Sequence, residues 1–304
     1  MFHVPRKMLT EWSKLSVRHL LSRSETRADL SCLYYSAAAY KSMAALTFGL
    51  TLVRHGETKY NKEGLLQGQG IDSVLSEIGL QQAEAAGCYL KDVEFTNVFV
   101  SDMLRAQQTA ETIVKHNSSC SALQMVCDPL LKEKSFGIAE GRRVQELIEM
   151  AQAAGQPFTD FTPPKGETHE QVKERVKEFL EKMLQQIGAE RWRDRGGDET
   201  SASAPPKPSP VVGQADDGVR GIPVHTLVVT HGVVIHVAVR FFVEELHCSL
   251  PSDFDRAHMF SLSPNTGLCR FILTMTKEDD RFKLSGIRCV FLNRRDHVIQ
   301  NGAR

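Results

Sequence analysis

Long hydrophobic runs are absent from this chain of 304 residues. No apolar stretch approaches the roughly 18 residues that a membrane-spanning helix needs, so we predict no membrane span. A net charge is absent too, because 37 lysines and arginines balance 37 aspartates and glutamates. This balance removes the global electrostatic attraction that is typical of nucleic-acid binders, and we predict no nucleic-acid partner. Any anion that the protein binds must be held by a local cluster of positive groups.

Cysteine is scarce and without pattern. The seven cysteines are odd in number and never spaced as C-x-x-C, which argues against a disulfide framework and against a zinc site. Free thiols are typical of a reducing compartment, so the sequence predicts an intracellular protein. A nucleophile elbow of the form G-x-S-x-G is also absent, which argues against a serine hydrolase.

The first 42 residues differ in composition from the remainder of the chain. They hold seven lysines and arginines against three acidic residues, together with many serines. Such a composition is typical of a mitochondrial transit peptide. The alternative is a disordered extension or an alternative start, since Met43 directly precedes the first predicted strand, and we favour this alternative. The predicted compartment is the cytoplasm, or the mitochondrion if residues 1–42 direct import.

Residues 43–304 show alternating strand and helix patterns. Residues 46–53 are apolar or β-branched at nearly every position, as in a strand that is buried on both faces. A helical pattern follows at 75–92, then a strand at 95–102 and a helix at 103–116. Alternation of this kind produces crossover connections, so we expect a three-layer αβα sandwich with a mostly parallel central sheet. Two closing strands, at 270–277 and 284–293, are expected to form an edge hairpin.

Another helix and a low-complexity insertion complete the predicted domain. Thr168 and Gln171 form a capping box. Apolar residues recur on one face of the following helix, a stripe that we assign to core packing: Val172, Val176, Phe179, Met183 and Ile187. Between residues 188 and 222 the pattern changes to proline, glycine and serine, which cannot build a core. We therefore expect a surface insertion that interrupts the sequence without dividing the domain.

Two predicted strands end in the same dipeptide, in TLVRHG at 51–56 and TLVVTHG at 226–232. Ligands of open α/β sheets gather beyond the carboxyl ends of the strands, so His55 and His231 are expected to share one crevice. Arg54 precedes the first histidine, and Arg105 lies in the first turn of a helix, where backbone amides also favour anions. Arginine matches the geometry of phosphate, so the crevice is predicted to bind phosphate.

Four motifs carry a resemblance to a known family: LVRHGET, SDMLRAQQTA, LKEKSFGIAEG and VVTHG. In this order and spacing they resemble those of the histidine phosphatase superfamily, which has the phosphoglycerate-mutase-like fold, and within it the fructose-2,6-bisphosphatase branch. The resemblance implies a phosphatase that needs no metal and no cofactor and that forms a phosphohistidine. Its substrates would be small phosphorylated metabolites, fructose-2,6-bisphosphate or 2,3-bisphosphoglycerate, and its activity would lower glycolytic flux.

The resemblance also implies a role for each matched residue. His55 would be the nucleophile, and Glu133 would protonate the leaving alkoxide and later activate water. Glu133 competes for this role with Glu57 and Glu140, and motif alignment favours Glu133. His231 would donate a hydrogen bond to the transferred phosphoryl group. Further contacts to phosphate are expected from Arg54, Asn61, Gly68, Arg105 and Gly232.

Other readings of the sequence stay open. A phosphoglycerate mutase would keep the phosphohistidine and return it to product, which requires that water be excluded. A scaffold of low turnover would keep the pocket and bind a phosphorylated ligand. Arg142 and Arg143 are expected to form a solvated face, with contact to a second phosphate as the alternative. We expect a monomer.

Overall fold

A strand that is buried on both faces, β1 (Ala45–Arg54), lies inside a six-stranded sheet of strand order β3-β2-β4-β1-β5-β6 in the computed structural model. The structure describes residues 44–120, 122–158, 161–192, 213–251 and 259–299. The predicted extension at 1–42 lies outside the described residues. The other strands are β2 (Asn97–Val100), β3 (Met125–Cys127), β4 (His225–Thr230), β5 (Leu268–Glu278) and β6 (Arg281–Arg294).

The sheet is mostly parallel, as predicted. Strands β1 to β4 run parallel to their neighbours, whereas β5 pairs antiparallel with β1 and forms the predicted hairpin with β6. In the register of β1 and β4, Arg54 lies opposite Thr230. His55 and His231, which directly follow these two strands, therefore lie at the same edge of the sheet.

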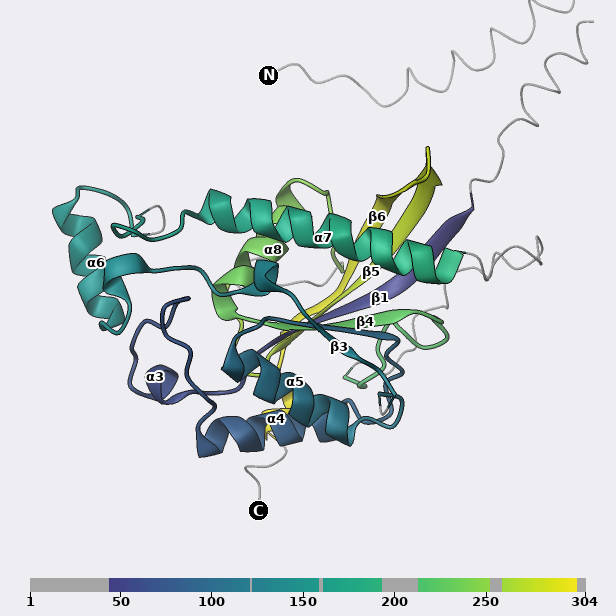
Figure 1. The fold of residues 1–304 in the computed structure, drawn as a ribbon, viewed down its shortest axis with the longest axis horizontal. Helices are drawn as coiled ribbons and strands as arrows, with labels where there is room; N and C mark the ends of the chain where they lie inside the picture. Colours follow the sequence, from purple (N-terminus) through teal and green to yellow (C-terminus); the bar gives the residue numbers. More distant parts are fainter. Residues whose placement is uncertain (1–43, 121, 159–160, 193–212, 252–258, 300–304) are drawn as a thin grey trace, which may run out of the picture. The chain divides into compact units, whose positions relative to one another are not determined.

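Helices cover both faces of the sheet, which confirms the three-layer architecture (Figure 1). One layer contains α4 (Glu77–Tyr89) and α5 (Leu104–His116), and the other contains α7 (His169–Arg191) and α8 (Gly232–Glu244). The remaining elements are short: α3 (Lys59–Lys62), η1 (Pro129–Leu131), η2 (Gly137–Ala139), α6 (Val144–Ala153) and α9 (Asp296–Ile299).

Helix α7 begins where the sequence predicts. The Thr168 hydroxyl accepts a hydrogen bond from the backbone N–H of Gln171, and the Gln171 side chain accepts one from the backbone N–H of Thr168. This capping box satisfies two donors that the first turn of a helix leaves without partners. The predicted apolar stripe, from Val172 to Ile187, is buried against the sheet.

The structure describes both ends of the predicted insertion at 188–222. Helix α7 continues through Gly188 to Arg191, and turns occupy residues 213–222. The buried guanidinium of Arg270 donates from Nη1 to the carbonyl oxygens of Ala215 at 2.6 Å and Asp217 at 3.1 Å. The last part of the insertion, residues 213–222, is thus held by contacts from a distant strand, which the composition of these residues does not reveal. Residues 193–212 lie outside the described residues.

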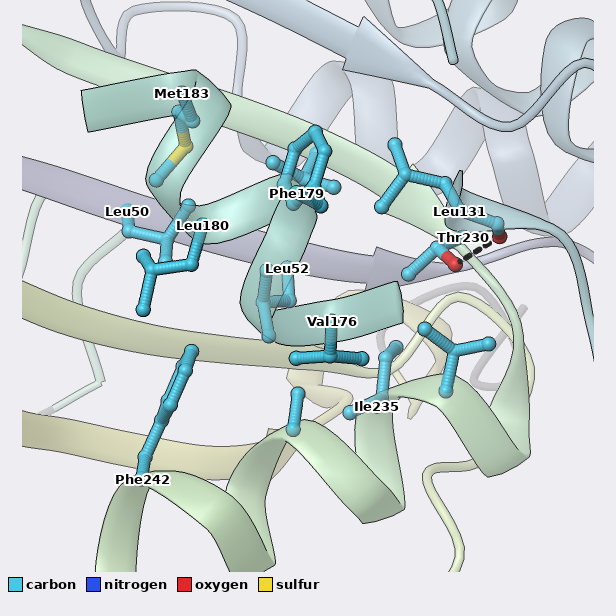
Figure 2. Close-up of a pocket in the computed structure, with 13 residues that line it drawn as sticks. Leu50, Leu52, Leu131, Val176, Phe179, Leu180, Met183, Thr230, Ile235 and Phe242 are labelled. Carbon is cyan, nitrogen blue, oxygen red and sulfur yellow. Dashed lines mark hydrogen bonds between the residues drawn. The ribbon is translucent and has the colours of Figure 1, made fainter. Parts of the chain in front are cut away.

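A small apolar pocket lies between the sheet and helices α7 and α8 (Figure 2). Its lining includes Leu52, Phe179 and Ile235, and no charged side chain contributes to it. The hydroxyl of Thr230 faces this side and donates to the Leu131 carbonyl at 2.8 Å (Figure 2). Apolar walls cannot replace the hydration of a phosphate, so this pocket is core packing and the phosphate site must lie elsewhere.

Candidate active site

The two histidines of the His-Gly dipeptides lie together at the carboxyl edge of the sheet. His55 follows β1 and His231 follows β4, and their ring centroids are 5.2 Å apart at an interplanar angle of 60°. Both side chains are buried. The parallel register of the two strands produces this meeting, which the repeated dipeptide predicts.

His55 is held as a neutral ring with one free nitrogen. Its Nδ1 lies 2.7 Å from the carbonyl oxygen of Gly56. Because a carbonyl only accepts hydrogen bonds, Nδ1 carries the proton and Nε2 keeps its lone pair. Burial lowers the pKa of His55 well below its usual value, and the charges of Arg105 and Arg54 lower it further. A bare Nε2 at neutral pH is the state that a nucleophilic histidine requires.

Arg54 is fixed by a loop from the far end of the chain. Its Nη1 donates to the carbonyl oxygen of Ser263 at 2.6 Å, while its Nε is buried and has no partner among the described residues. Gly232 lies against the same guanidinium, since a Cβ built on Gly232 would come within 3.3 Å of the Arg54 Nε. The absence of a side chain at position 232 therefore allows Arg54 and the first turn of α8 to approach each other.

Arg105 is also fully buried, in the first turn of α5. Its Nη1 donates to the carbonyl oxygen of Ile71 at 3.1 Å and its Nη2 to that of Gly68 at 3.4 Å. Burial lowers the pKa of Arg105 to about 10, so the guanidinium keeps its charge at neutral pH. Its Nε has no partner among the described residues.

Three buried nitrogens of this cluster thus lack a hydrogen-bond partner within the described part of the chain: the donors Arg54 Nε and Arg105 Nε, and the ring nitrogen His231 Nδ1. A buried polar atom without a partner costs about 1–3 kcal/mol, and more where the group is charged. Native proteins therefore satisfy nearly all such atoms, and those left over need an explanation. An oxyanion bound between these residues would accept hydrogen bonds from both arginines, and from His231 when Nδ1 carries the ring proton. The pattern indicates an anion site.

Glu133 lies on the loop that follows η1 and is buried. Its Oε1 accepts from the backbone N–H of Lys134 at 2.8 Å, and its Oε2 accepts from the backbone N–H of Val233 at 3.3 Å. The second bond ties the carboxyl group to the helix turn that follows His231. Burial raises the pKa of Glu133, although these hydrogen bonds and the two arginines oppose the rise. A carboxyl group with a raised pKa is suited to donate a proton.

The two rival acids have structural partners. Glu57 accepts from the hydroxyl of Ser76, which begins α4, at 2.9 Å. Glu140 accepts from the backbone N–H groups of Gly70 at 2.8 Å and Phe136 at 3.1 Å. These contacts join neighbouring loops. Glu133 remains the acid that hydrogen-bonds the turn after His231.

Asn61 and Gly68 contact other residues that surround the site. The Asn61 Oδ1 accepts from the backbone N–H of Thr58 at 3.2 Å and from the Asn265 side chain at 3.3 Å. Gly68 offers its carbonyl oxygen to Arg105, and a Cβ built on it would collide with the Glu140 carboxylate. Both residues hold the surroundings of Arg105 and His55, and direct contact to phosphate stays a prediction.

A turn near the end of the chain supports the nucleophile, a role that the sequence did not reveal. The Asn265 side chain donates to the His55 carbonyl at 3.2 Å, and the Thr266 N–H donates to the Arg54 carbonyl at 3.1 Å. Thr266 has a φ of 53°, which is strained for a β-branched residue. The motif SPNTG at 263–267 was visible in the sequence, but its contact with β1 depends on strand pairing.

Lys134 is a second residue that sequence reasoning missed. Its side chain is only 3% exposed, and its ammonium has no hydrogen bond or ion pair among the described residues. It lies 5.7 Å from the centroid of the Phe136 ring. Burial lowers the pKa of Lys134, while the carboxylates of Glu133 and Glu167 raise it. In the sequence, only its position directly after Glu133 could have indicated a place near the site.

The arginines considered for a second phosphate lie at the surface. Arg142 and Arg143 are exposed. The Arg142 guanidinium donates to the Ile138 carbonyl at 3.2 Å and pairs with Glu146 at 3.6 Å. Arg143 begins helix α6. This arrangement agrees with a solvated face.

Known proteins resemble this chain in sequence and in fold. The model of the histidine phosphatase superfamily (branch 1) matches residues 50–192, and close relatives extend the match over most of the chain. The chain therefore belongs to the histidine phosphatase superfamily. Among its relatives is the probable fructose-2,6-bisphosphatase TIGAR A of Danio rerio, 56% identical over 84% of this chain and 100% of the relative. The fructose-2,6-bisphosphatase TIGAR of Bos taurus is 40% identical over 83% of this chain and 96% of the relative.

Solved structures confirm the phosphoglycerate-mutase-like fold. The phosphoglycerate mutase of Bacillus anthracis superposes with a TM-score of 0.59 at 20% identity, over 85% of this chain and 98% of its own. A mycobacterial glucosyl-3-phosphoglycerate phosphatase in complex with VO3 gives a TM-score of 0.52 at 21% identity, over 78% and 97% of the two chains. At these identities the likeness concerns the fold alone.

Within the part of the chain that the structure describes, no group of three or more His, Cys, Asp or Glu side chains is placed to hold a metal ion. Nor does any helix in the same segments combine the length and the apolar character that crossing a membrane demands.

Proposed function

We propose that this protein hydrolyses phosphate monoesters through a phosphohistidine on His55, without a metal, and that its substrate is fructose-2,6-bisphosphate. The observation that carries the proposal is the pair of buried donors without partners, Arg54 Nε and Arg105 Nε, together with the unpartnered Nδ1 of His231, beside the bare Nε2 of His55. Donors fixed in advance around an anion are what phosphoryl transfer needs, because charge spreads over the equatorial oxygens in the transition state.

The first step forms a bond between the Nε2 of His55 and phosphorus and breaks the bond between phosphorus and the ester oxygen. The electron pair of the broken bond goes to the leaving alkoxide, which takes the proton of the Glu133 carboxyl group. The raised pKa of Glu133 keeps a larger fraction of this acid protonated than an exposed glutamate would have. The two arginines neutralise charge on the phosphoryl oxygens throughout.

The second step releases phosphate. The Glu133 carboxylate takes a proton from water as the water oxygen attacks phosphorus, and the bond from phosphorus to Nε2 breaks. The ring of His55 returns to its neutral form with the proton still on Nδ1, held by the Gly56 carbonyl. Glu133 is then protonated again, so one residue serves as acid and base in turn.

Two observations support a substrate that carries a second anionic group. The curated relatives at 40% and 56% identity are both named as fructose-2,6-bisphosphatases. Lys134 directly follows Glu133, the proposed acid, and the residue is largely removed from solvent. A second phosphate on the leaving group would give its ammonium an anionic partner besides the carboxylates of Glu133 and Glu167. Removal of fructose-2,6-bisphosphate would lower glycolytic flux.

Phosphate release in the presence of EDTA tests the proposed function. We expect wild type to release phosphate from fructose-2,6-bisphosphate, and His55→Ala to release none above background. 2,3-Bisphosphoglycerate and 3-phosphoglycerate serve as comparison substrates, and conversion of 3-phosphoglycerate into 2-phosphoglycerate is followed in parallel. Isomerisation without phosphate release would indicate a mutase. Tight retention of phosphorylated ligand without either reaction would indicate a scaffold, and both outcomes would reject the proposal.

We also propose that the protein acts as a monomer in the cytoplasm. Light scattering coupled to size-exclusion chromatography should give the mass of a single chain.

Imaging of a tagged full-length chain beside one that starts at Met43 tests the role of residues 1–42. Loss of a mitochondrial signal in the shorter chain would identify those residues as a transit peptide, whereas the same cytoplasmic signal from both would exclude it.

A further inference from the structure

The two ring nitrogens of His231 have different surroundings. Nε2 lies 2.8 Å from the hydroxyl oxygen of Ser101, and both residues are fully buried. Nδ1 is buried too and has no partner within the described residues. Ser101 follows β2, where its backbone N–H donates to the Val229 carbonyl of β4 at 3.0 Å. The serine is therefore held firmly beside the strand that carries His231.

From this geometry we propose that Ser101 fixes the tautomer of His231, so that Nδ1 carries the proton and donates it as a hydrogen bond to the transferred phosphoryl group. Ser101 acts as a positioning residue in this role. The inference rests on the proposed function and deepens it, because it assigns the hydrogen-bond partner that makes a neutral His231 into a donor.

The hydroxyl of Ser101 has one acceptor within reach. It accepts a hydrogen bond from the backbone N–H of Met103 at 3.4 Å, and its own proton needs an acceptor. Nε2 of His231 is the acceptor that the hydroxyl contacts in the described part of the chain. If Nε2 carried the proton, the serine hydroxyl would be a further buried donor without a partner. Donation from Ser101 to Nε2 satisfies the hydroxyl and leaves the ring proton on Nδ1.

The choice of tautomer matters because His231 cannot easily become a cation. The ring is buried and lies beside His55, Arg54 and Arg105, and burial followed by the charge of Arg105 lowers its pKa well below the usual value. A neutral imidazole donates from only one nitrogen. With the proton on Nε2, the lone pair of Nδ1 would face an anionic oxygen and repel it. A hydrogen bond from the Ser101 hydroxyl to Nε2 disfavours this tautomer.

Nitrogen-15 NMR of histidine-labelled protein measures the tautomer directly. The His231 signals are assigned by their loss in His231→Gln, and spectra are recorded at neutral pH with inorganic phosphate or vanadate present. We expect a protonated Nδ1 and an unprotonated Nε2. A proton on Nε2 in the wild-type protein would overturn the proposal. Because this measurement needs no turnover, it is separate from the test of phosphatase activity.

Variants of Ser101 test the consequence. Loss of the selected donor in Ser101→Ala should weaken inhibition by inorganic phosphate and vanadate about tenfold, and the NMR spectrum should show the other tautomer or a mixture. Ser101→Cys keeps a weak donor of similar size and should lie between alanine and wild type. Thr226→Val, which removes a buried hydroxyl elsewhere on β4, is the matched control and should leave the His231 signals unchanged. An unchanged tautomer in a folded Ser101→Ala would contradict the proposal.

Discussion

The rings of His55 and His231 meet edge to face, with centroids 5.2 Å apart and an interplanar angle of 60°. They come from the ends of neighbouring parallel strands, and each has one nitrogen engaged by a fixed partner, Gly56 for His55 and Ser101 for His231. Nδ1 of His231 is buried and has no partner among the described residues, and the proton that Gly56 holds on Nδ1 of His55 leaves Nε2 of that ring with its lone pair. This arrangement supports the proposed roles of His55 as nucleophile and His231 as donor.

Replacement of His55 by alanine should abolish the covalent intermediate. We expect no labelled protein after brief incubation of His55→Ala with a ³²P-labelled substrate and acid quenching, whereas wild type should give a label that is labile to acid and stable to alkali. Removal of a catalytic nucleophile lowers kcat by about 10⁴ to 10⁶ in well-studied hydrolases. Label on the alanine variant would show that another residue is the nucleophile.

The loss of kcat in Glu133→Gln should depend strongly on the leaving group of the substrate. Without the acid, a sugar alkoxide must leave unprotonated, so we expect kcat to fall about 10² to 10⁴ for a sugar phosphate. p-Nitrophenyl phosphate needs little protonation of its leaving group, and its first step should fall much less. In wild type, the raised pKa of Glu133 means that kcat/KM for a sugar phosphate falls as pH rises through that value. Equal losses for both substrates would argue against an acid role.

Lys134→Met should discriminate between substrates by their charge. For fructose-2,6-bisphosphate we expect KM to rise about tenfold to a hundredfold, the equivalent of one charge-assisted hydrogen bond. For p-nitrophenyl phosphate, whose leaving group is uncharged before cleavage, KM should change little. Lys132→Met is the matched control, because Lys132 pairs with Asp102 at 3.3 Å and its side chain is 37% exposed. Parallel losses on both substrates would assign Lys134 a structural role.

Acid should destabilise the domain through its buried histidines. Burial lowers the pKa of His297 to about 4, whereas an unfolded histidine titrates near 6.5. As pH falls from about 6.5 to 4, the unfolded chain gains a proton that the folded state does not, so the free energy of unfolding falls by up to roughly 3 kcal/mol for this group. Burial lowers the pKa of His225 as well, with the same sign.

Urea titrations at pH 7 and pH 5 measure this effect. In His297→Gln the loss of stability between the two pH values should be smaller than in wild type, because one proton uptake is removed. The exposed His116 offers the control variant His116→Gln, which should keep the wild-type difference. Identical pH dependence in all three proteins would show that His297 is not held neutral by the fold.

Sequence patterns determined the layers of the fold and most of the candidate site. The apolar and β-branched run of β1 shows that this strand is buried on both faces, and the capping box at Thr168 marks the start of α7. Both signals are local, and local chemistry is visible in a single chain. The four motifs implied that His55, Glu133 and His231 act at one site; in the structure the two histidine rings lie 5.2 Å apart, and Glu133 hydrogen-bonds the helix turn after His231.

Tertiary structure alone decided what surrounds those residues. Three features depend on residues that are distant in sequence. They are the burial of Lys134, the contact between Ser101 and His231, and the hydrogen bond from Arg270 to the Ala215 carbonyl. A serine after a strand and a lysine after a glutamate are each common on solvated surfaces, so composition gives them no special role. Their partners come from strand register and helix packing, which fix distance and solvent access together. The sequence by itself thus determined which groups can react, and the packed fold decided their protonation and their unpaired donors.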